Sequence, residues 1–200
     1  MAYYDTPMTK LDAVNVCLSA MGEPKITSLD AAGVDAQMAS DLVDEVSLEV
    51  QGQGWHWNRE VHTLSPDING YLVLPSNTLR VDTVGMDQPI DVIQRGGRLY
   101  NKDDNTYVFD QDLDLEIIVA LPYEDMPFAA KNFVTYRAAR RLQQRMLGSE
   151  TLQKFNEKDE NRAWVLMLQD EAATQDSNML SDSWSTNSIL SRGTFSRGAY

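Results

Sequence analysis

The chain of 200 residues carries a formal net charge of -13, and 42% of its residues are hydrophobic. Such acidity argues against a dedicated DNA-binding or anionic-membrane protein, because both usually need a positive field to collect their partner. No apolar run approaches the roughly 18 residues of a membrane span, and the first residues lack the layout of a signal peptide, so we expect neither membrane insertion nor secretion.

Two amphipathic helices are predicted before residue 55. The first runs from about Lys10 to Met21, with Thr9 and Asp12 as a capping box and Gly22 at its end. The second runs roughly over residues 35–51, and its predicted buried stripe repeats every four residues. That stripe is Val34, Met38, Leu42, Val46 and Val50. The other faces of this helix carry no basic residue, so the helix is the natural electrostatic complement of the basic helix at residues 127–148. Its acidic residues are Asp35, Asp41, Asp44, Glu45 and Glu49.

Residues 55–122 are predicted to form a meander of three or four antiparallel strands. The hydrophobic period shortens to two, and β-branched and aromatic residues dominate. Gly96 and Gly97 suit a tight hairpin turn that needs positive φ. The strand segments are residues 55–64, 70–75, 79–84, 91–95, 98–101, 106–109 and 113–121. Trp55 and Trp57 are expected to share one strand face, where packing is favoured over a stacking platform for bases or sugars.

The longest helical pattern, residues 127–148, is basic in an otherwise acidic chain. Its five basic residues, with no acidic one among them, are Lys131, Arg137, Arg140, Arg141 and Arg145. Its predicted buried stripe is Ala130, Val134, Ala138, Leu142 and Met146. The basic face suits either phosphate groups or ion pairs within and between subunits, and the 30 acidic residues of the chain favour the second. A further helix follows to about residue 173, with Leu152, Phe155, Ala163, Leu166 and Met167 as its apolar stripe.

These elements predict an α+β fold in four segments. Residues 1–54 and 123–175 each contribute a helix pair to one four-helix bundle, and residues 55–122 form the central β domain. Residues 176–200 form an extended tail, rich in serine and glycine but with spaced apolar side chains. Such anchors predict that the tail orders against a partner.

No catalytic constellation, cofactor site or metal site is predicted. The alternating carboxylates of Asp110, Asp112, Asp114 and Glu116 resemble the start of a calcium loop, but Leu115 stands where that loop needs glycine. A strand with one acidic solvent face explains them better. His56 and His62 lack zinc-site partners, and Cys17 lies on an apolar helical stripe as a buried thiol.

Four stretches of the chain together carry a family resemblance. They are AVNVCLSAMGEPKITSL (13–29), QGQGWHWN (51–58), QRGGRLYN (94–101) and YEDMPFAAKNFVTYRAARRLQQRMLG (123–148). In this order they resemble the tail tubular protein A family, the head-to-tail adaptors of short-tailed phages. The resemblance implies a non-enzymatic structural protein of the virion tail, made and assembled in the host cytoplasm. It further implies a ring of twelve copies beneath the portal protein, with the tail nozzle protein (tail tubular protein B) docked below. Tail fibres would attach around that platform, and DNA would leave through the central channel without specific binding.

Residue roles follow from this resemblance as expectations. The expected subunit interface comprises Arg137, Arg140, Arg141, Arg145, Asp41, Asp44 and Glu45. The expected anchors on the portal or a neighbouring subunit are Trp184, Ile189, Leu190 and Phe195. No residue is assigned to the nozzle or the fibres. Two alternatives stay open, a DNA-binding accessory protein that uses the basic helix and a tail-associated glycan-degrading enzyme.

Overall fold

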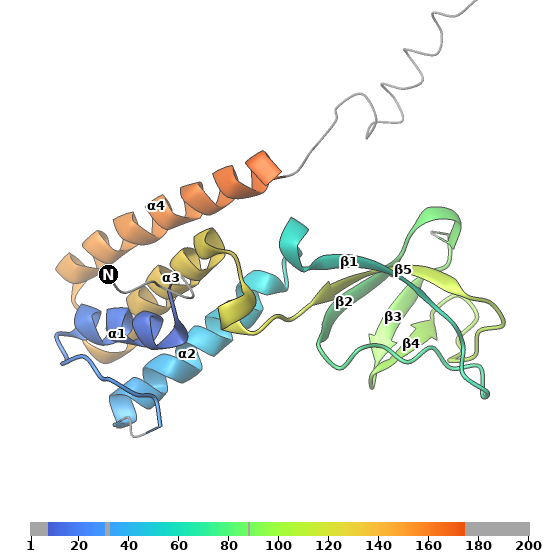
Figure 1. Ribbon diagram of the computed structural model, residues 1–200, viewed down its shortest axis with the longest axis horizontal. Coiled ribbons are helices and arrows are strands. Elements are labelled where there is room, and N and C mark those ends of the chain that lie inside the picture. The colour runs from blue at the N-terminus through green and yellow to red at the C-terminus, as the bar shows by residue number, and fades with distance from the viewer. Residues whose placement is uncertain (1–7, 31–32, 88, 175–200) are drawn as a thin grey trace, which may run out of the picture.

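The computed structural model describes residues 8–30, 33–87 and 89–174, and it places helices and strands in separate halves of an elongated molecule (Figure 1). The helices are α1 (Lys10–Met21), α2 (Val34–Gln51), α3 (Phe128–Met146) and α4 (Glu150–Thr174). The strands are β1 (Arg59–Leu64), β2 (Thr78–Thr83), β3 (Val92–Arg95), β4 (Arg98–Asn101) and β5 (Leu113–Val119). The predicted α+β class, with antiparallel strands, is confirmed.

Helix α1 begins and ends where its capping residues predict. The backbone N–H of Asp12 donates to Thr9 Oγ1 at 3.2 Å, and the Asp12 carboxylate accepts from the Thr9 backbone N–H at 2.9 Å. At the other end Gly22 has φ 83°, the left-handed conformation that closes a helix. Local sequence therefore determines both ends of this helix.

Helix α3 is the centre of the helical half, because each of the other three helices packs against it. Ala130, Val134, Ala138 and Leu142 are buried as predicted, whereas Met146 is exposed in the last turn of the helix. The helix pairs from the two ends of the chain thus share one hydrophobic core. The more specific geometry of a four-helix bundle stays a prediction.

The predicted stripe of α2 is only partly right. Leu42, Val46 and Val50 are buried, but Val34 is 75% exposed and Met38 is exposed as well. A helix has 3.6 residues per turn, so a strict four-residue repeat drifts by about 40° at each step and leaves the buried side after two or three steps. The predicted stripe of α4 is also only partly right, because Ala163 and Met167 alone are buried among those of its members whose burial the structure describes. Phe155 and Leu166 are exposed there, since α4 packs mainly against α3.

The sheet is not the predicted meander. Its three strands have the order β1-β5-β2, all antiparallel, while β3 and β4 form a separate hairpin through the predicted Gly96–Gly97 turn. Strand β5 takes the central position and pairs along both edges. Its buried positions alternate from Leu113 to Ile117 and continue through Ile118 and Val119. The predicted strand segments at residues 70–75 and 106–109 form only isolated bridges.

Residues 55–58 were predicted as strand, and that prediction is wrong. They form a short 3-10 helix, His56–Asn58, preceded by the buried Trp55. The Trp55 indole donates to the Val50 carbonyl at 2.7 Å and meets the Trp164 ring edge-on at 5.7 Å. Trp57 is partly buried against the same core. The two tryptophans therefore pack in the helical half and do not share a strand face.

Two buried amide side chains tie the helical half to the strand half. Gln51, at the end of α2, donates to the Leu121 carbonyl at 3.1 Å and accepts from the Leu121 N–H at 2.7 Å. Asn58 donates to the carbonyls of Gln51 and Val119 at 2.9 and 3.0 Å and accepts from the Trp55 N–H at 2.8 Å. Both passages of the chain between the halves, after α2 and after β5, are thus held by the same pair of amides.

Candidate functional site

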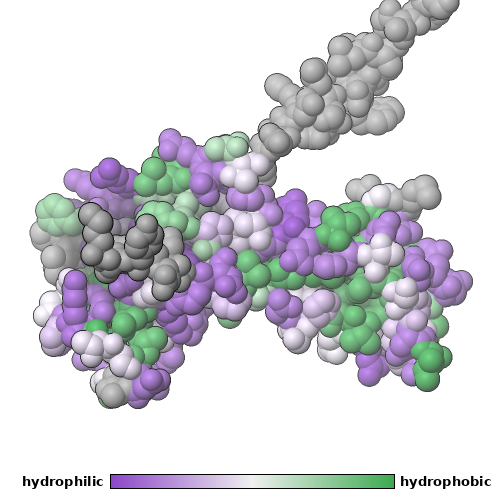
Figure 2. Space-filling view, viewed as in Figure 1, coloured by the Kyte–Doolittle hydropathy of each residue, from purple (hydrophilic) through white to green (hydrophobic). Residues whose placement is uncertain are grey.

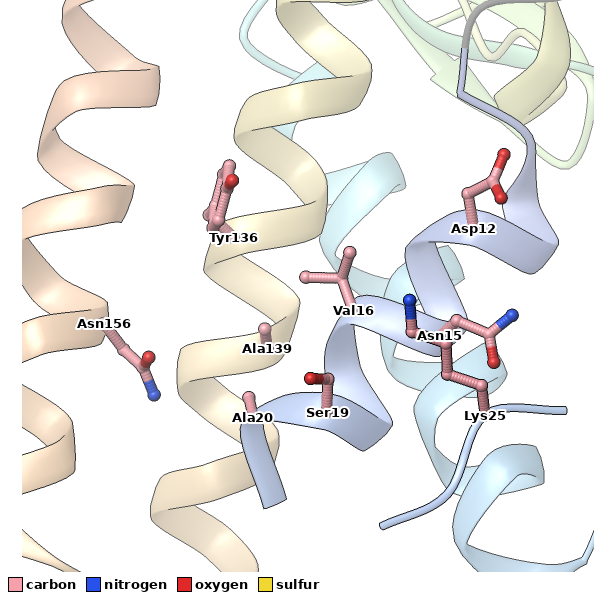
Figure 3. A pocket seen from close by; sticks show the side chains of 9 residues that line it. All are labelled: Asp12, Asn15, Val16, Ser19, Ala20, Lys25, Tyr136, Ala139 and Asn156. Atoms are coloured by element: carbon pink, nitrogen blue, oxygen red, sulfur yellow. The ribbon is translucent and has the colours of Figure 1, made fainter. Parts of the chain in front are cut away.

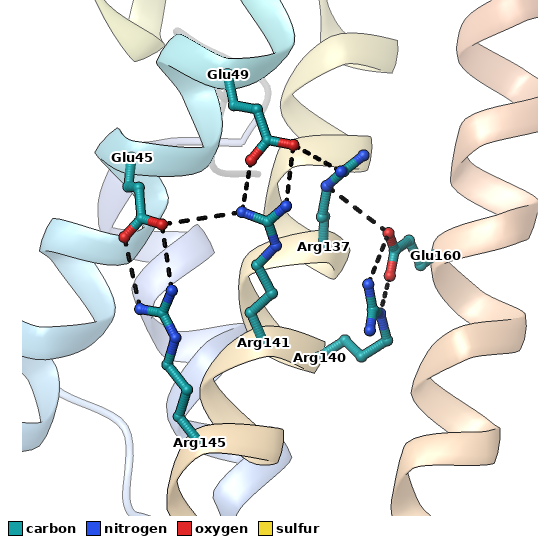
Figure 4. A network of polar contacts seen from close by, with 7 residues as sticks. All are labelled: Glu45, Glu49, Arg137, Arg140, Arg141, Arg145 and Glu160. Carbon is teal, nitrogen blue, oxygen red and sulfur yellow. Dashed lines mark hydrogen bonds and ion pairs between the residues drawn. The ribbon is translucent and has the colours of Figure 1, made fainter.

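Four arginines of α3 form one polar network with glutamates on the two flanking helices (Figure 4). These arginines are Arg137, Arg140, Arg141 and Arg145. The last three follow the first by three, four and eight residues, so all four lie along one side of α3. Helix α2 packs on one flank of α3 and α4 on the other. The network therefore joins helices from both ends of the chain.

On the α4 flank the partner is Glu160. Its carboxylate forms a close ion pair with Arg140 Nε and accepts from Arg140 Nη2 at 3.3 Å, while Arg137 Nε lies 3.9 Å away. The Glu160 side chain is only 12% exposed, so the two guanidinium groups are its main charged partners. The hydrogen bond to Glu160 raises the pKa of Arg140 above its ordinary value.

On the α2 flank the main partner is Glu49. Arg141 binds it through both guanidinium ends, at 2.6 and 2.9 Å, and Arg137 Nη2 lies 2.7 Å from the same carboxylate. The hydrogen bond from Arg141 is the chief cause that lowers the pKa of Glu49. Glu45 pairs with Arg145 at 3.2 Å and more loosely with Arg141 at 3.9 Å.

The other sequence-predicted interface residues lie on α2 outside this network. Asp44 pairs with Lys10 of α1 at 2.7 Å, and no described residue pairs with the exposed Asp41. Lys131 is not part of the basic face, because it is buried and its ammonium donates to the Glu124 carbonyl. That the seven predicted residues form a subunit interface stays a prediction.

The predicted acidic face of the second helix includes Glu49, but the predicted interface residues include neither Glu49 nor Glu160, the main partners of the arginines. For Glu49 a signal existed, because Glu45 and Glu49 have the same four-residue spacing as Arg141 and Arg145. Glu160 lies in the polar stretch KDEN (158–161), where the sequence does not distinguish it from its neighbours. Only the docking of α4 on α3 selects it.

Replacing Arg140 by glutamate should lower the free energy of unfolding by about 2 kcal/mol, because the partly buried Glu160 would face a second carboxylate in place of its cation. The double variant R140E/E160R should recover much of this loss. Arg145→Glu is the matched control, since that side chain is 55% exposed and the expected loss is about 0.5 kcal/mol or less. Urea titration followed by circular dichroism measures all three, and equal losses for R140E and R145E would contradict the expectation.

A pocket of about 440 Å³ lies between α1, α3 and α4 (Figure 3). Its polar side chains already have structural roles: Asp12 caps α1, and Asn15 makes two hydrogen bonds to the backbone of Ile26, at 2.8 and 3.0 Å. Its lining residues are Asp12, Asn15, Val16, Ser19, Ala20, Lys25, Tyr136, Ala139 and Asn156. This set does not form a nucleophile with a neighbouring base.

Cys17 and His56, which lie outside the network, have structural roles. Burial raises the pKa of the Cys17 thiol to about 12, so it stays protonated at neutral pH. His56 contacts Glu171 through its ring, and its backbone N–H donates to the same carboxylate at 3.1 Å, which holds the end of α4 at the junction. In the described ranges no three His, Cys, Asp or Glu side chains gather as metal ligands, and no helix there is long and apolar enough to cross a membrane.

The predicted anchors Trp184, Ile189, Leu190 and Phe195 lie outside the residues that the structure describes. Their contact with a portal or a neighbouring subunit therefore stays a prediction.

Comparison with known proteins shows that the chain is similar to phage tail proteins. A family described as "Tail tubular protein" matches residues 11–177. Tail tubular protein A of Klebsiella phage KP34 is 28% identical over 127 residues, which cover 64% of this chain and 67% of that protein. The family match extends over the helical core, the junction and both sheets.

Proposed function

This chain belongs to the tail tubular protein family, and from that membership we propose that it is a head-to-tail adaptor, whose copies form a ring between the portal and the tail nozzle of a short-tailed phage. As a member of this family it is a structural component of the virion tail and not an enzyme. The alternative of a glycan-degrading enzyme is thereby set aside.

The observation that carries the proposal is the family match over residues 11–177, which includes almost every described element. In the proposed assembly, twelve copies pack side by side through their helical units, residues 1–54 and 123–175, each arranged as a four-helix bundle. The β unit, residues 55–122, offers the tail-side surface to the nozzle protein and the tail fibres. Residues 176–200 reach the portal or an adjacent copy through Trp184, Ile189, Leu190 and Phe195. Assembly takes place in the host cytoplasm.

The charge distribution supports a channel through which DNA passes without specific binding. The chain carries a net charge of -13, so a ring of copies presents a strongly negative field to the phosphates of passing DNA. The four arginines of α3 are engaged by glutamates of the same subunit. This engagement disfavours a DNA-binding accessory role, for which the same arginines would have to contact phosphates.

Mixing the full chain with purified portal protein tests the proposal. Negative-stain electron microscopy should show a ring of twelve copies seated on the portal, and the chain ending at residue 175 should fold normally but dock less well. A full chain that leaves the portal bare at micromolar concentrations would overturn the adaptor function. Binding to duplex DNA, with a slope of about -4 when the logarithm of the binding constant is plotted against that of the salt concentration, would support the DNA-binding alternative instead.

A further inference from the structure

The outer face of the β3–β4 hairpin carries a cluster of exposed arginines and aliphatic side chains with exposed or partly exposed tyrosines. Directly opposite residues of an antiparallel pair share a face, so the pairs Ile93–Tyr100 and Arg95–Arg98 point the same way. The isolated bridges of Tyr71 with Val108 and of Val73 with Arg98 extend this face. We call the cluster the hairpin patch: Tyr71, Val73, Ile93, Arg95, Arg98, Tyr100, Tyr107 and Val108.

The hairpin patch combines exposed apolar area with cations that lack a direct ion pair. Val73 is 60% exposed, and the aliphatic side chains of Ile93 and Val108 are exposed beside it. The Arg95 guanidinium lies 3.9 Å from the centre of the Tyr100 ring, and that of Arg98 lies 4.7 Å from the centre of the Tyr71 ring. Neither guanidinium forms an ion pair with another described residue, so their N–H donors remain available to a partner.

The charge of Arg98 acts on the nearby Asp67, although the two side chains do not form a direct ion pair. The pKa of Asp67 is lowered chiefly by the hydrogen bond from the Tyr71 backbone N–H, with a smaller contribution from the charge of Arg98. Tyrosine and arginine in this setting are the residue types that dominate the energetics of protein interfaces. The hairpin patch therefore has the composition of a protein-binding surface.

A surface of the opposite charge lies on α2. Val34, Met38 and Leu48 are large apolar side chains exposed on this helix, and Asp41 and Asp44 lie between them in the sequence. At about 100° per residue these five positions fall within about 120° of the helix circumference. We call them the α2 outer face. Helix α2 carries no basic residue, so this face is both acidic and apolar.

The two surfaces lie in different halves of the molecule. Figure 1 places α2 in the helical half and the hairpin of β3 and β4 at the other end of the long axis. Figure 2 shows hydrophobic residues reaching the surface in both halves. Extended apolar patches on a soluble subunit commonly mark interaction sites.

We propose that the hairpin patch of one copy docks on the α2 outer face of the next copy. Arg95 and Arg98 then meet Asp41, which pairs with no described residue, and Asp44, whose side chain is 55% exposed beside its ion pair with Lys10. The exposed aliphatic side chains of both surfaces are covered together. A contact between two different surfaces runs head to tail, and it closes into a ring when the rotation between copies permits. A contact between two hairpin patches is disfavoured, because it would place arginines against arginines. The inference rests on the proposed ring and adds to its helical contacts a second contact, for which one part of the β unit is used.

Charge reversal in the full chain tests this pairing by sedimentation velocity. The wild-type chain should associate with increasing concentration up to about 100 µM. Variants R95E/R98E and D41K/D44K should each associate at least about ten-fold more weakly, because each places like charges across the contact. An equimolar mixture of the two variants should regain association, since each reversed surface then meets its complement. Variant K154E/R162E is the matched control, because it makes the same charge change as R95E/R98E on exposed positions of α4 and should behave as wild type.

The outcomes separate this inference from the proposed function. A wild-type chain that stays monomeric, a D41K/D44K variant that associates like wild type, or a variant mixture without recovery overturns the pairing. If the wild-type ring forms on the portal and both reversed variants still form it, the pairing fails and the adaptor function stands. If the surfaces pair in solution but no ring forms on the portal, the adaptor function fails and the pairing stands.

Discussion

Replacing Gly54 by alanine should lower the free energy of unfolding by about 3 kcal/mol or more, the largest effect that we expect from a single methyl group in this chain. Gly54 has φ 80°, and a Cβ there would lie 2.2 Å from Ile118 Cδ1. Ile118 is buried on β5, so its side chain must repack in a confined space, with Arg80 Nη2 only 3.3 Å from the same Cβ position. Urea unfolding followed by tryptophan fluorescence measures the loss.

Gly22→Ala is the matched control for this variant. Gly22 has nearly the same backbone conformation, φ 83°, but a Cβ there would meet no atom within 4 Å. It should therefore cost only the strain of the left-handed conformation, about 1 kcal/mol. The difference between the two variants isolates the steric conflict with Ile118, and equal losses would show that no such conflict exists.

Replacing Asn58 by alanine should lower the free energy of unfolding by about 3 kcal/mol, because three buried hydrogen bonds disappear together. The Asn58 side chain is completely buried, and it serves the backbone of α2, β5 and the turn between the halves at once. The carbonyl of Val119 and the N–H of Trp55 would lose a partner in a place where water cannot replace it. Denaturant unfolding followed by circular dichroism measures the change.

Asn77→Ala serves as the control for Asn58. Its side chain is exposed and donates a single hydrogen bond, to the Ala120 carbonyl at 3.1 Å. The expected loss is about 0.5 kcal/mol, since water can take over that bond. If Asn58→Ala proved as mild as Asn77→Ala, the amide junction would not couple the two halves.

The sequence predicted best those features that depend on neighbouring residues. The Thr9 and Asp12 capping box, the Gly22 end and the Gly96–Gly97 turn involve only residues close in the chain, and all three are confirmed. The order β1-β5-β2 could not be predicted in this way, because it depends on which distant strand can be buried on both faces. The 3-10 turn after Trp55 was missed for the same reason, since tertiary contacts with Val50 and Trp164 hold it.

The arginine network also combines residues that the sequence reveals with residues that only the tertiary structure brings together. The unusual charge of residues 127–148 revealed Arg137, Arg140, Arg141 and Arg145 from sequence alone. Their partners depend on how α2 and α4 pack against α3, and one of these partners, Glu160, has no distinguishing local pattern. Charge composition thus identified the arginines and the acidic face of α2 with Glu45 and Glu49, and only Glu160 depended on the tertiary structure.

The paired amides Gln51 and Asn58 also bear on the curvature of an assembly. They fix both passages of the chain between the helical and strand halves, so the angle between the halves is a property of the folded subunit. In a ring whose contacts use one surface from each half, that angle decides how many copies close the circle. The number of subunits would then be encoded inside each monomer, by two buried side chains at the junction of its halves.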